Sequence, residues 1–336
     1  MNPSRESHNG LMPVLEVNDL HVAIGDVQIL RGVSFSVEAG RTLGVVGESG
    51  CGKSMTGLAL MGMLPPGGGV KSGSIMLDGR DLTKLKPRDW LDIRGQDISM
   101  VMQDPFTSLN PLMQVGDQIA EVYRVHKNMP KAEARAKAID MIRAVGVPSP
   151  EASARKYPHQ MSGGQRQRIV IAIAFASKPK VLIADEPTTA LDVTLQAQIL
   201  RLLNDMQEAE NTAVVIISHD IGVIGSVADD IAVYYAGRVV EYGPTEAVIR
   251  RPQHPYTQAL LAAMPQVGQD RLLAIGGQPP NLATLDGSCA FAPRCAHRFD
   301  RCAEEPGLIE SPTGSKAACW LLASAPEHRN VDSVDL

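Results

Sequence analysis

A predicted phosphate-binding loop lies in the N-terminal part of the chain. Residues 47–54 read G-E-S-G-C-G-K-S, the spacing of a P-loop, whose backbone N–H groups surround a phosphate. An apolar run precedes this loop and a helical pattern follows it, so the dipole of that helix would also favour an anion. We expect Lys53 to reach the β- and γ-phosphates of a nucleotide and Ser54 to bind Mg²⁺; a glycine-rich turn without a ligand is the alternative. The predicted nucleotide-binding residues are Gly47, Glu48, Ser49, Gly50, Cys51, Gly52, Lys53 and Ser54.

Two carboxylates follow an apolar run further along the chain. Residues 180–186 read K-V-L-I-A-D-E, which predicts a buried strand that ends in Asp185 and Glu186. A P-loop works with an acidic residue that holds Mg²⁺, and we expect Asp185 to do so. The adjacent Glu186 could polarise an attacking water as a general base. The alternative is a pair of acids at an ordinary solvated strand end.

The hydrophobic pattern places these motifs in an α/β fold. Apolar or alternating runs predict strands at residues 14–22, 29–37, 97–102 and 213–217, among others. Strands that alternate with helices favour a mainly parallel sheet, while closely spaced strands in the N-terminal part predict an antiparallel layer beside the loop. Residues 105–162 contain two stretches with helical spacing, and we expect them to form a helical subdomain inserted into the core.

The chain divides into two predicted domains. Its 336 residues are too many for one compact core. The motifs lie within residues 1–250, whereas prolines break residues 251–336 into short pieces, which predicts a loop-rich C-terminal extension. Residues 1–13 are polar and are expected to form a short disordered leader.

Composition excludes some classes of protein. The formal net charge is −5 and aromatic residues make up 4% of the chain, so we expect no nucleic-acid partner. The longest apolar run, residues 169–176, is far shorter than the roughly 20 residues that span a membrane. These features predict a cytoplasmic protein.

A third motif suggests a family. Residues 160–165 read Q-M-S-G-G-Q, and this resembles the LSGGQ signature of ATP-binding cassette (ABC) ATPases, with Met161 in place of leucine. A serine and glycines at a helix start also suit anion binding. The resemblance implies a head-to-tail dimer, in which the signature of one subunit closes on the γ-phosphate of ATP bound to the other. The implied signature contacts are Ser162, Gly163, Gly164 and Gln165.

The same resemblance implies roles for four further positions. Gln103 matches the glutamine that senses Mg²⁺ and the attacking water, and His219 matches the histidine that hydrogen-bonds the γ-phosphate. Asp192, in the sequence Ala190-Leu191-Asp192, resembles the loop that crosses the dimer interface, and it could also cap the next helix. Where the family usually stacks an aromatic residue on adenine, this chain has Ile24. We therefore expect an aliphatic contact with the base.

Motifs outside the cassette narrow the resemblance. Residues 157–160 read Y-P-H-Q, residues 254–261 read H-P-Y-T-Q-A-L-L and residues 291–295 read F-A-P-R-C. Together they resemble the ATPase subunits of bacterial oligopeptide, dipeptide and nickel importers. The resemblance implies a second ATPase subunit, two membrane permeases, an extracytoplasmic substrate-binding protein and a peripheral location on the cytoplasmic face of the membrane.

Four cysteines lie together in the C-terminal extension. Their spacing is C-x5-C-x6-C-x16-C, which is not the paired C-x2-C of common zinc modules. Four thiolates can hold a 4Fe–4S cluster or Zn²⁺, and we expect the iron–sulfur cluster, with zinc or reduced buried thiols as alternatives. The predicted ligands are Cys289, Cys295, Cys302 and Cys319.

The sequence is also compatible with other functions. The same architecture could import nickel or another small solute. A soluble ABC ATPase of DNA repair or translation is less consistent with the sequence, which has one signature and no long coiled coil. A metal-bearing scaffold without enzymatic activity would not need Lys53, Asp185, Glu186 and His219 together.

Overall fold

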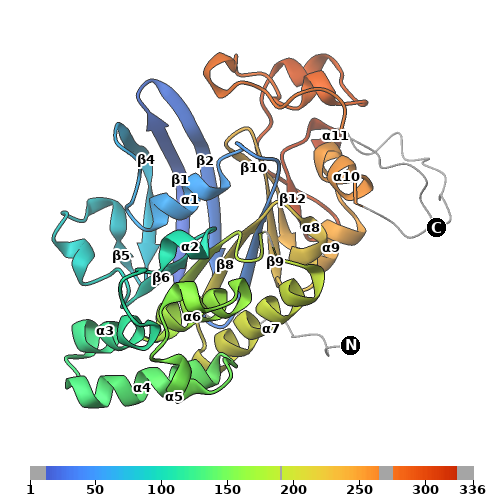
Figure 1. Ribbon diagram of the computed structural model, residues 1–336. Coiled ribbons are helices and arrows are strands. Elements are labelled where there is room, and N and C mark those ends of the chain that lie inside the picture. The colour runs from blue at the N-terminus through green and yellow to red at the C-terminus, as the bar shows by residue number, and fades with distance from the viewer. Residues whose placement is uncertain (1–12, 190, 265–274, 324–336) are drawn as a thin grey trace.

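The computed structural model describes residues 13–189, 191–264 and 275–323. The predicted leader therefore lies almost wholly outside the described residues. Figure 1 shows a central sheet with helices packed against it, a second sheet beside it, a helical region at one end and a loop-rich region at the other. None of the described helices is long and apolar enough to cross a membrane.

The main sheet places the P-loop at its centre. Its strand order is β11-β12-β10-β9-β3-β8-β7-β6, and β3 pairs in parallel with both β8 and β9. Every residue of β3 and β8 is buried. Parallel strands that are covered on both faces typically have such continuous apolar sequences. The predicted α/β fold is confirmed. The strands are β3 (Thr42–Val46), β6 (Ile98–Val101), β7 (Val181–Asp185), β8 (Ala213–Ser218), β9 (Asp230–Tyr235), β10 (Arg238–Pro244), β11 (Ile309–Glu310) and β12 (Lys316–Ala317).

A second, antiparallel sheet lies beside the main one. It consists of β1 (Leu15–Ile24), β2 (Val27–Val37), β4 (Gly68–Leu77) and β5 (Arg80–Asp81), in the order β2-β1-β4-β5. The expected antiparallel layer is present. The strand before the P-loop, however, belongs to the main sheet.

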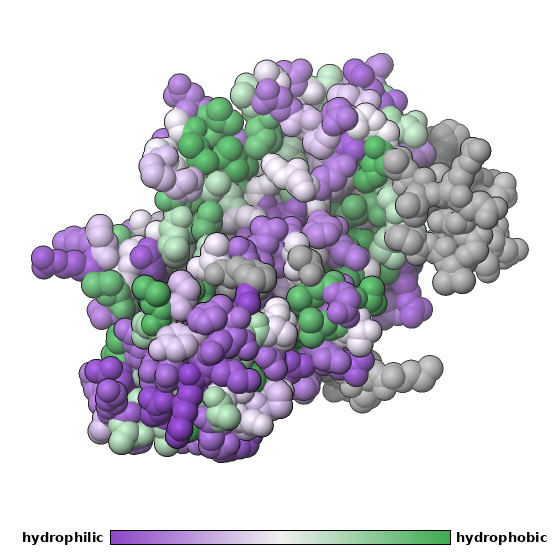
Figure 2. Space-filling view, viewed as in Figure 1, coloured by the Kyte–Doolittle hydropathy of each residue, from purple (hydrophilic) through white to green (hydrophobic). Residues whose placement is uncertain are grey.

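Helices α2 (Pro105–Ser108), α3 (Val115–Lys127), α4 (Lys131–Ala144) and α5 (Pro150–Ser153) occupy the expected insertion. Val115 and Ile119 on α3 and Ile142 on α4 are fully buried, because α3 and α4 pack their apolar faces against each other and against α6 (Gly163–Phe175). The outer surface over α4 and α5 is mostly hydrophilic (Figures 1 and 2). The limits of residues 105–162 as a subdomain stay a prediction.

Further helices follow the P-loop or connect strands of the main sheet. Helix α1 (Lys53–Leu60) follows the P-loop, and α7 (Val193–Glu210) joins β7 to β8. The short helices α8 (Ile221–Gly225) and α9 (Thr245–Arg250) were not predicted, because one turn or so is too short to show a helical period. Helix α10 (Pro255–Ala262) lies at the start of the C-terminal extension.

The C-terminal extension is joined to the main core. Strand β12 pairs with β10 and so continues the main sheet, while Phe291 is 4% exposed and lies in the main hydrophobic cluster. Helix α11 (Trp320–Ala323) and several 3-10 turns complete it. The extension is loop-rich, as expected, but its stability comes from packing on the core. The division of the chain at residue 250 stays a prediction.

The expected iron–sulfur cluster in this extension is wrong. Cys289, Cys295, Cys302 and Cys319 are free thiols, and the described residues contain no group of three or more His, Cys, Asp or Glu side chains that could hold a metal ion. The four cysteines line a cavity of about 10 Å³ together with Phe291, Phe299 and Trp320, which is at most the room for one water. Burial raises the pKa of the Cys319 thiol to about 11. Zinc has no support either, and the thiols are apolar packing groups.

His254 anchors the start of α10. It is 2% exposed, and its Nδ1 accepts a hydrogen bond from the Tyr256 backbone N–H at 3.0 Å, which caps the helix. Its backbone N–H donates to the carboxylate of Glu241, which is fully buried. Burial lowers the pKa of His254 to about 4. The imidazole is therefore neutral in the folded protein at neutral pH.

His254→Asn is expected to reduce the acid sensitivity of folding. The unfolded chain binds a proton at His254 below about pH 6.5, whereas the folded chain does so only near pH 4, so stability falls as the pH drops between these values. We expect His254 to lower the free energy of unfolding by about 2 kcal/mol as the pH falls from about 7.5 to about 5. Denaturant unfolding of the wild type and of His254→Asn at both pH values checks this expectation. An equal loss of unfolding free energy in the variant would contradict it.

Candidate functional site

The P-loop has a conformation that its glycines permit. Gly47 has φ 153°, and a Cβ there would lie 2.3 Å from the carbonyl oxygen of Tyr234. Gly52, at φ 105°, caps α1, and a Cβ there would lie 2.8 Å from Leu30. Both positions therefore require glycine. The loop curls closely over the end of the sheet, which is the cradle that a phosphate needs.

Lys53 is held inside this loop. Its side chain is 6% exposed, and Nζ donates to the carbonyl oxygens of Gly47 at 2.7 Å and of Glu48 at 2.9 Å. A buried ammonium group needs such partners, because its charge is costly to desolvate. The geometry keeps one cation at the centre of the loop, where an anionic phosphate would be its natural partner.

Ser54 and Asp185 form an oxygen-rich pair beside Lys53. The Ser54 hydroxyl donates to Asp185 Oδ1 at 3.1 Å. Burial raises the pKa of Asp185, and the hydrogen bond from Ser54 opposes that effect. A hydroxyl and a carboxylate are the ligand types that Mg²⁺ prefers, and a divalent cation would stabilise the ionised carboxylate. These residues therefore fit a bound Mg²⁺.

Glu186 is the centre of a second group of polar contacts. Its Oε2 accepts hydrogen bonds from Gln103 Nε2 and from Thr189 Oγ1, each at 2.8 Å, and its Oε1 lies 3.4 Å from His219 Nδ1. Burial raises the pKa of Glu186, but the contacts with Thr189 and His219 outweigh it, so the pKa is lowered. Glu186 is thus an ionised acceptor at neutral pH, as a general base must be.

Sheet order explains why these residues meet. Gln103 follows β6, Glu186 follows β7 and His219 follows β8, and these three strands are parallel neighbours. Their carboxyl ends therefore share one edge of the sheet, where ligands bind in open α/β folds. Glu186 also has φ 47°, an uncommon value for a residue with a side chain, and its N–H donates to the Ile217 carbonyl oxygen at 2.9 Å. Such uncommon backbone conformations are often found at functional sites.

The signature residues lie at the start of α6. Ser162 and Gln165 form a capping box, in which each side chain accepts a hydrogen bond from the other residue's N–H, at 3.3 and 3.2 Å. Ser162 is exposed, Gly163 begins the helix, and Gly164 is buried where a Cβ would contact Leu195 at 2.7 Å. Their role toward a second subunit stays a prediction.

Two other predicted residues have simple local roles. Asp192 caps α7 by accepting a hydrogen bond from the Leu195 N–H at 2.9 Å, and it is exposed, so a further contact across an interface is open to it. Ala190 lies outside the described residues. Ile24 ends β1 at the hairpin with β2, where it is only partly buried. Its contact with a base stays a prediction.

Comparison with known proteins decides the family. The family described as "ABC transporter" matches residues 30–189, and the one described as "Oligopeptide/dipeptide transporter, C-terminal region" matches residues 240–302. The chain is 47% identical to the oligopeptide transport ATP-binding protein OppD of Salmonella typhimurium, over 91% of this chain and 93% of the relative. It is 46% identical to the dipeptide transport ATP-binding protein DppD of Bacillus subtilis, over 94% and 96%. The chain belongs to the family of ABC transporter ATPases.

Solved structures support this family assignment. The ATP-binding cassette MJ0796, in a dimeric post-hydrolysis state bound to ADP and Pi, matches with a TM-score of 0.61 and 25% identity, over 69% of this chain and 98% of that one. The cassette cbiO1 of Clostridium perfringens matches with a TM-score of 0.62 and 27% identity, over 71% and 91%. This ABC ATPase is therefore an enzyme that hydrolyses ATP, with Mg²⁺ as the expected cofactor, and the predicted cassette fold is confirmed.

Three residues that contact the site of this ABC ATPase were not predicted as site residues from the sequence. Thr189, whose hydroxyl donates a hydrogen bond to Glu186, was not predicted. Its position three residues after Glu186 in the same turn was the local feature that could have indicated this contact. Arg294 and Tyr256 of the extension both contact Glu48 of the P-loop. Both residues lie in motifs that carry the family resemblance, but no local pattern indicates that they contact Glu48.

Proposed function

We propose that this chain is the ATP-hydrolysing subunit of an importer of dipeptides or oligopeptides. The observation that supports hydrolysis best is the convergence of Gln103 and His219 on Glu186, next to the Ser54–Asp185 pair. The substrate class follows from the relatives, which are named for oligopeptide or dipeptide transport and resemble both the cassette and the extension. Nickel import is not favoured, since the relatives compared above are named for peptides.

Each residue of the site has a proposed task. The P-loop N–H groups and Lys53 bind the β- and γ-phosphates, while Ser54 and Asp185, with Gln103, hold Mg²⁺, which supplies charge neutralisation when bound. Glu186 orients and deprotonates the attacking water, and His219 donates to the γ-phosphate and keeps Glu186 oriented. Ile24 contacts the adenine.

A second subunit completes the site in this proposal. Ser162, Gly163, Gly164 and Gln165 would contact ATP held by the P-loop of a second, similar ATPase, and Asp192 would cross the interface. The exposure of Ser162 and its place at a helix N-terminus suit this contact, because free N–H groups there attract an anion. The relation to a cassette solved as a dimer supports the arrangement.

Two permeases and an extracytoplasmic binding protein complete the proposed transporter. The chain would lie against the cytoplasmic face of the membrane and move the permeases when ATP closes the dimer. Gln103 links the site to the helical insertion, since it follows β6 and precedes α2. Movement of that insertion would carry the effect of ATP to the permeases.

Purification with its partners tests this proposal. The full chain, tagged and extracted in mild detergent, is expected to retain two multi-span permeases and a second ATPase. ATP hydrolysis by that complex is expected to rise when dipeptide-loaded or oligopeptide-loaded binding protein is added. Recovery of soluble partners alone, or a complex stimulated only by a nickel-loaded binding protein, would contradict peptide import.

A further inference from the structure

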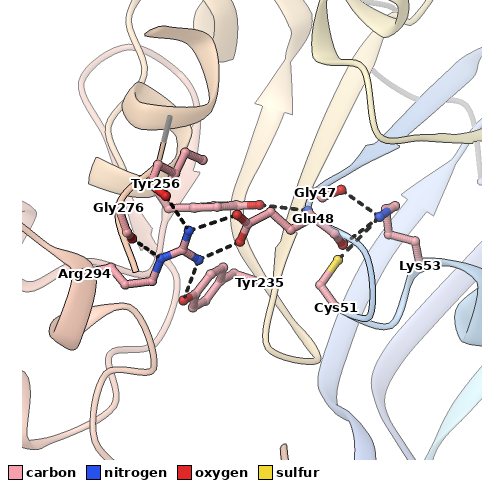
Figure 3. A network of polar contacts seen from close by, with 9 residues as sticks. Gly47, Glu48, Cys51, Lys53, Tyr235, Tyr256, Gly276 and Arg294 are labelled. Carbon is pink, nitrogen blue, oxygen red and sulfur yellow. Dashed lines mark hydrogen bonds and ion pairs between the residues drawn. The ribbon is translucent and has the colours of Figure 1, made fainter. Parts of the chain in front are cut away.

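The outer side of the P-loop is joined to the C-terminal extension by an ion pair. Arg294 donates to both carboxylate oxygens of Glu48, from Nη1 to Oε2 at 2.6 Å and from Nη2 to Oε1 at 2.9 Å (Figure 3). The Arg294 side chain is 4% exposed and that of Glu48 is 23% exposed. A paired fork of this kind is the strongest and most directional contact that arginine makes with a carboxylate.

Arg294 is itself fixed by its surroundings. Its Nε donates to the Gly276 carbonyl oxygen at 2.8 Å, and its Nη1 lies 3.3 Å from the Tyr235 hydroxyl. The guanidinium lies 5.8 Å from the Tyr235 ring centroid and 5.9 Å from that of Phe291. The hydrogen bonds to Glu48 raise the pKa of Arg294 further above its usual value. The cation is therefore permanent and cannot turn away from the loop at low cost.

A second contact from the extension reaches the backbone of the same residue. The Glu48 N–H donates to the Tyr256 hydroxyl at 2.9 Å, and Tyr256 is fully buried in α10 against Tyr235 and Phe291. The Glu48 carbonyl oxygen accepts from Lys53. The amide, the carbonyl and the side chain of Glu48 are thus all engaged, and two of these three contacts come from the extension.

The charge of Glu48 makes this arrangement informative. Its carboxylate belongs to the loop that is proposed to bind the phosphates of ATP, and like charges brought near each other repel. Arg294 neutralises that carboxylate and turns it outward, toward the extension. The extension also covers this side of the loop, where residues 48–51 and Pro279, Pro280 and Leu282 enclose a cavity of about 110 Å³.

We propose that Arg294 is a positioning residue for ATP binding, which acts through Glu48 to hold the P-loop in its phosphate-binding shape and to cancel its one negative side chain. The C-terminal extension is then part of the nucleotide site of its own subunit. This inference rests on the proposed nucleotide-binding role of the P-loop and not on the peptide substrate.

Equilibrium binding of MgATP to the full chain tests the proposal. Arg294→Gln is expected to raise the dissociation constant about tenfold or more, because it leaves the Glu48 carboxylate unpaired beside the phosphates. Adding Glu48→Gln to that variant removes the repelling charge and is expected to restore most of the affinity. Wild-type affinity in Arg294→Gln, or a double variant that binds no better than the single one, would overturn the proposal.

A matched control separates positioning from stability. Glu305 also joins the extension to the core, through ion pairs at 2.7 Å each with Arg31 and Arg238, which both lie outside the P-loop. Glu305→Gln is expected to lower the unfolding temperature as Arg294→Gln does, yet to leave MgATP affinity unchanged. An equal loss of affinity in Glu305→Gln would show that the extension acts only through stability and would overturn the role of Arg294.

Two more variants keep the outcome interpretable. Arg294→Lys keeps the positive charge but loses the paired hydrogen bonds of the guanidinium, so we expect a dissociation constant between those of the wild type and Arg294→Gln. This variant can be measured even if Arg294→Gln does not fold. Wild-type affinity in Arg294→Lys would reject the need for the paired hydrogen bonds. Lys53→Ala tests the nucleotide site itself. Loss of binding in Lys53→Ala with none in Arg294→Gln would reject this inference alone, whereas unchanged binding in Lys53→Ala would reject the site.

Discussion

Glu186→Gln is expected to abolish ATP hydrolysis while MgATP still binds. Glutamine keeps the size and a hydrogen-bonding oxygen but cannot take a proton, so turnover should fall by roughly 10²–10⁴-fold. Its amide would still face Gln103, Thr189 and His219, which contact the carboxylate in the wild type. Steady-state phosphate release and MgATP binding, measured on the same preparation, check the loss of hydrolysis and the retained binding.

The ATP-bound state of Glu186→Gln gives this prediction a second readout. Because the nucleotide is not consumed, the closed dimer with the second ATPase should persist and be visible by size-exclusion chromatography. Asp205→Asn is the matched control, since it makes the same carboxylate-to-amide change at an exposed position on α7 and should leave turnover unchanged. Retained hydrolysis in Glu186→Gln would reject Glu186 as the base.

Lys53→Ala is expected to weaken MgATP binding by about 100-fold, through loss of charge-assisted hydrogen bonds to two phosphates. In the folded chain this ammonium group is buried and satisfied by the Gly47 and Glu48 carbonyl oxygens. The substitution therefore also leaves those two acceptors without their present donor, and a lower unfolding temperature is expected. Titration with a fluorescent ATP analogue and a thermal unfolding curve measure the two effects separately.

Lys71→Ala is the control for this substitution. Lys71 is exposed on β4, so removing its charge changes the net charge equally without touching the P-loop. It should bind nucleotide as the wild type does. Equal affinity in Lys53→Ala and Lys71→Ala would mean that the phosphates bind elsewhere.

The sequence was sufficient to predict the parts of the site that depend on local patterns. The P-loop, the Asp185–Glu186 strand end and the helix start at Ser162 each combine a spacing with a flanking element, and each lies in the expected element. The assignment of Gln103 and His219 to the site came from a family resemblance, which did not predict that both contact Glu186. Only the order β6-β7-β8 explains these contacts physically.

Contacts between distant segments were beyond sequence reasoning. Arg294 lies 246 positions from Glu48, and no local pattern joins them. Strand β12 has only two residues, too few for an alternating pattern, so its addition to the main sheet was not foreseen. The prediction about the four cysteines failed for a related reason, since spacing does not show that the thiols surround a space too small for a metal cluster.

Peptide uptake by cells tests the central claim most directly. Cells whose own copy of this gene is replaced by the wild type, by Glu186→Gln or by Asp205→Asn would be given a radiolabelled di- or oligopeptide, with nickel uptake measured in parallel. If ATP hydrolysis at Glu186 drives peptide import, Glu186→Gln abolishes peptide uptake, Asp205→Asn does not, and nickel uptake is equal in all three. Undiminished peptide uptake in Glu186→Gln, at wild-type levels of protein, would contradict the account.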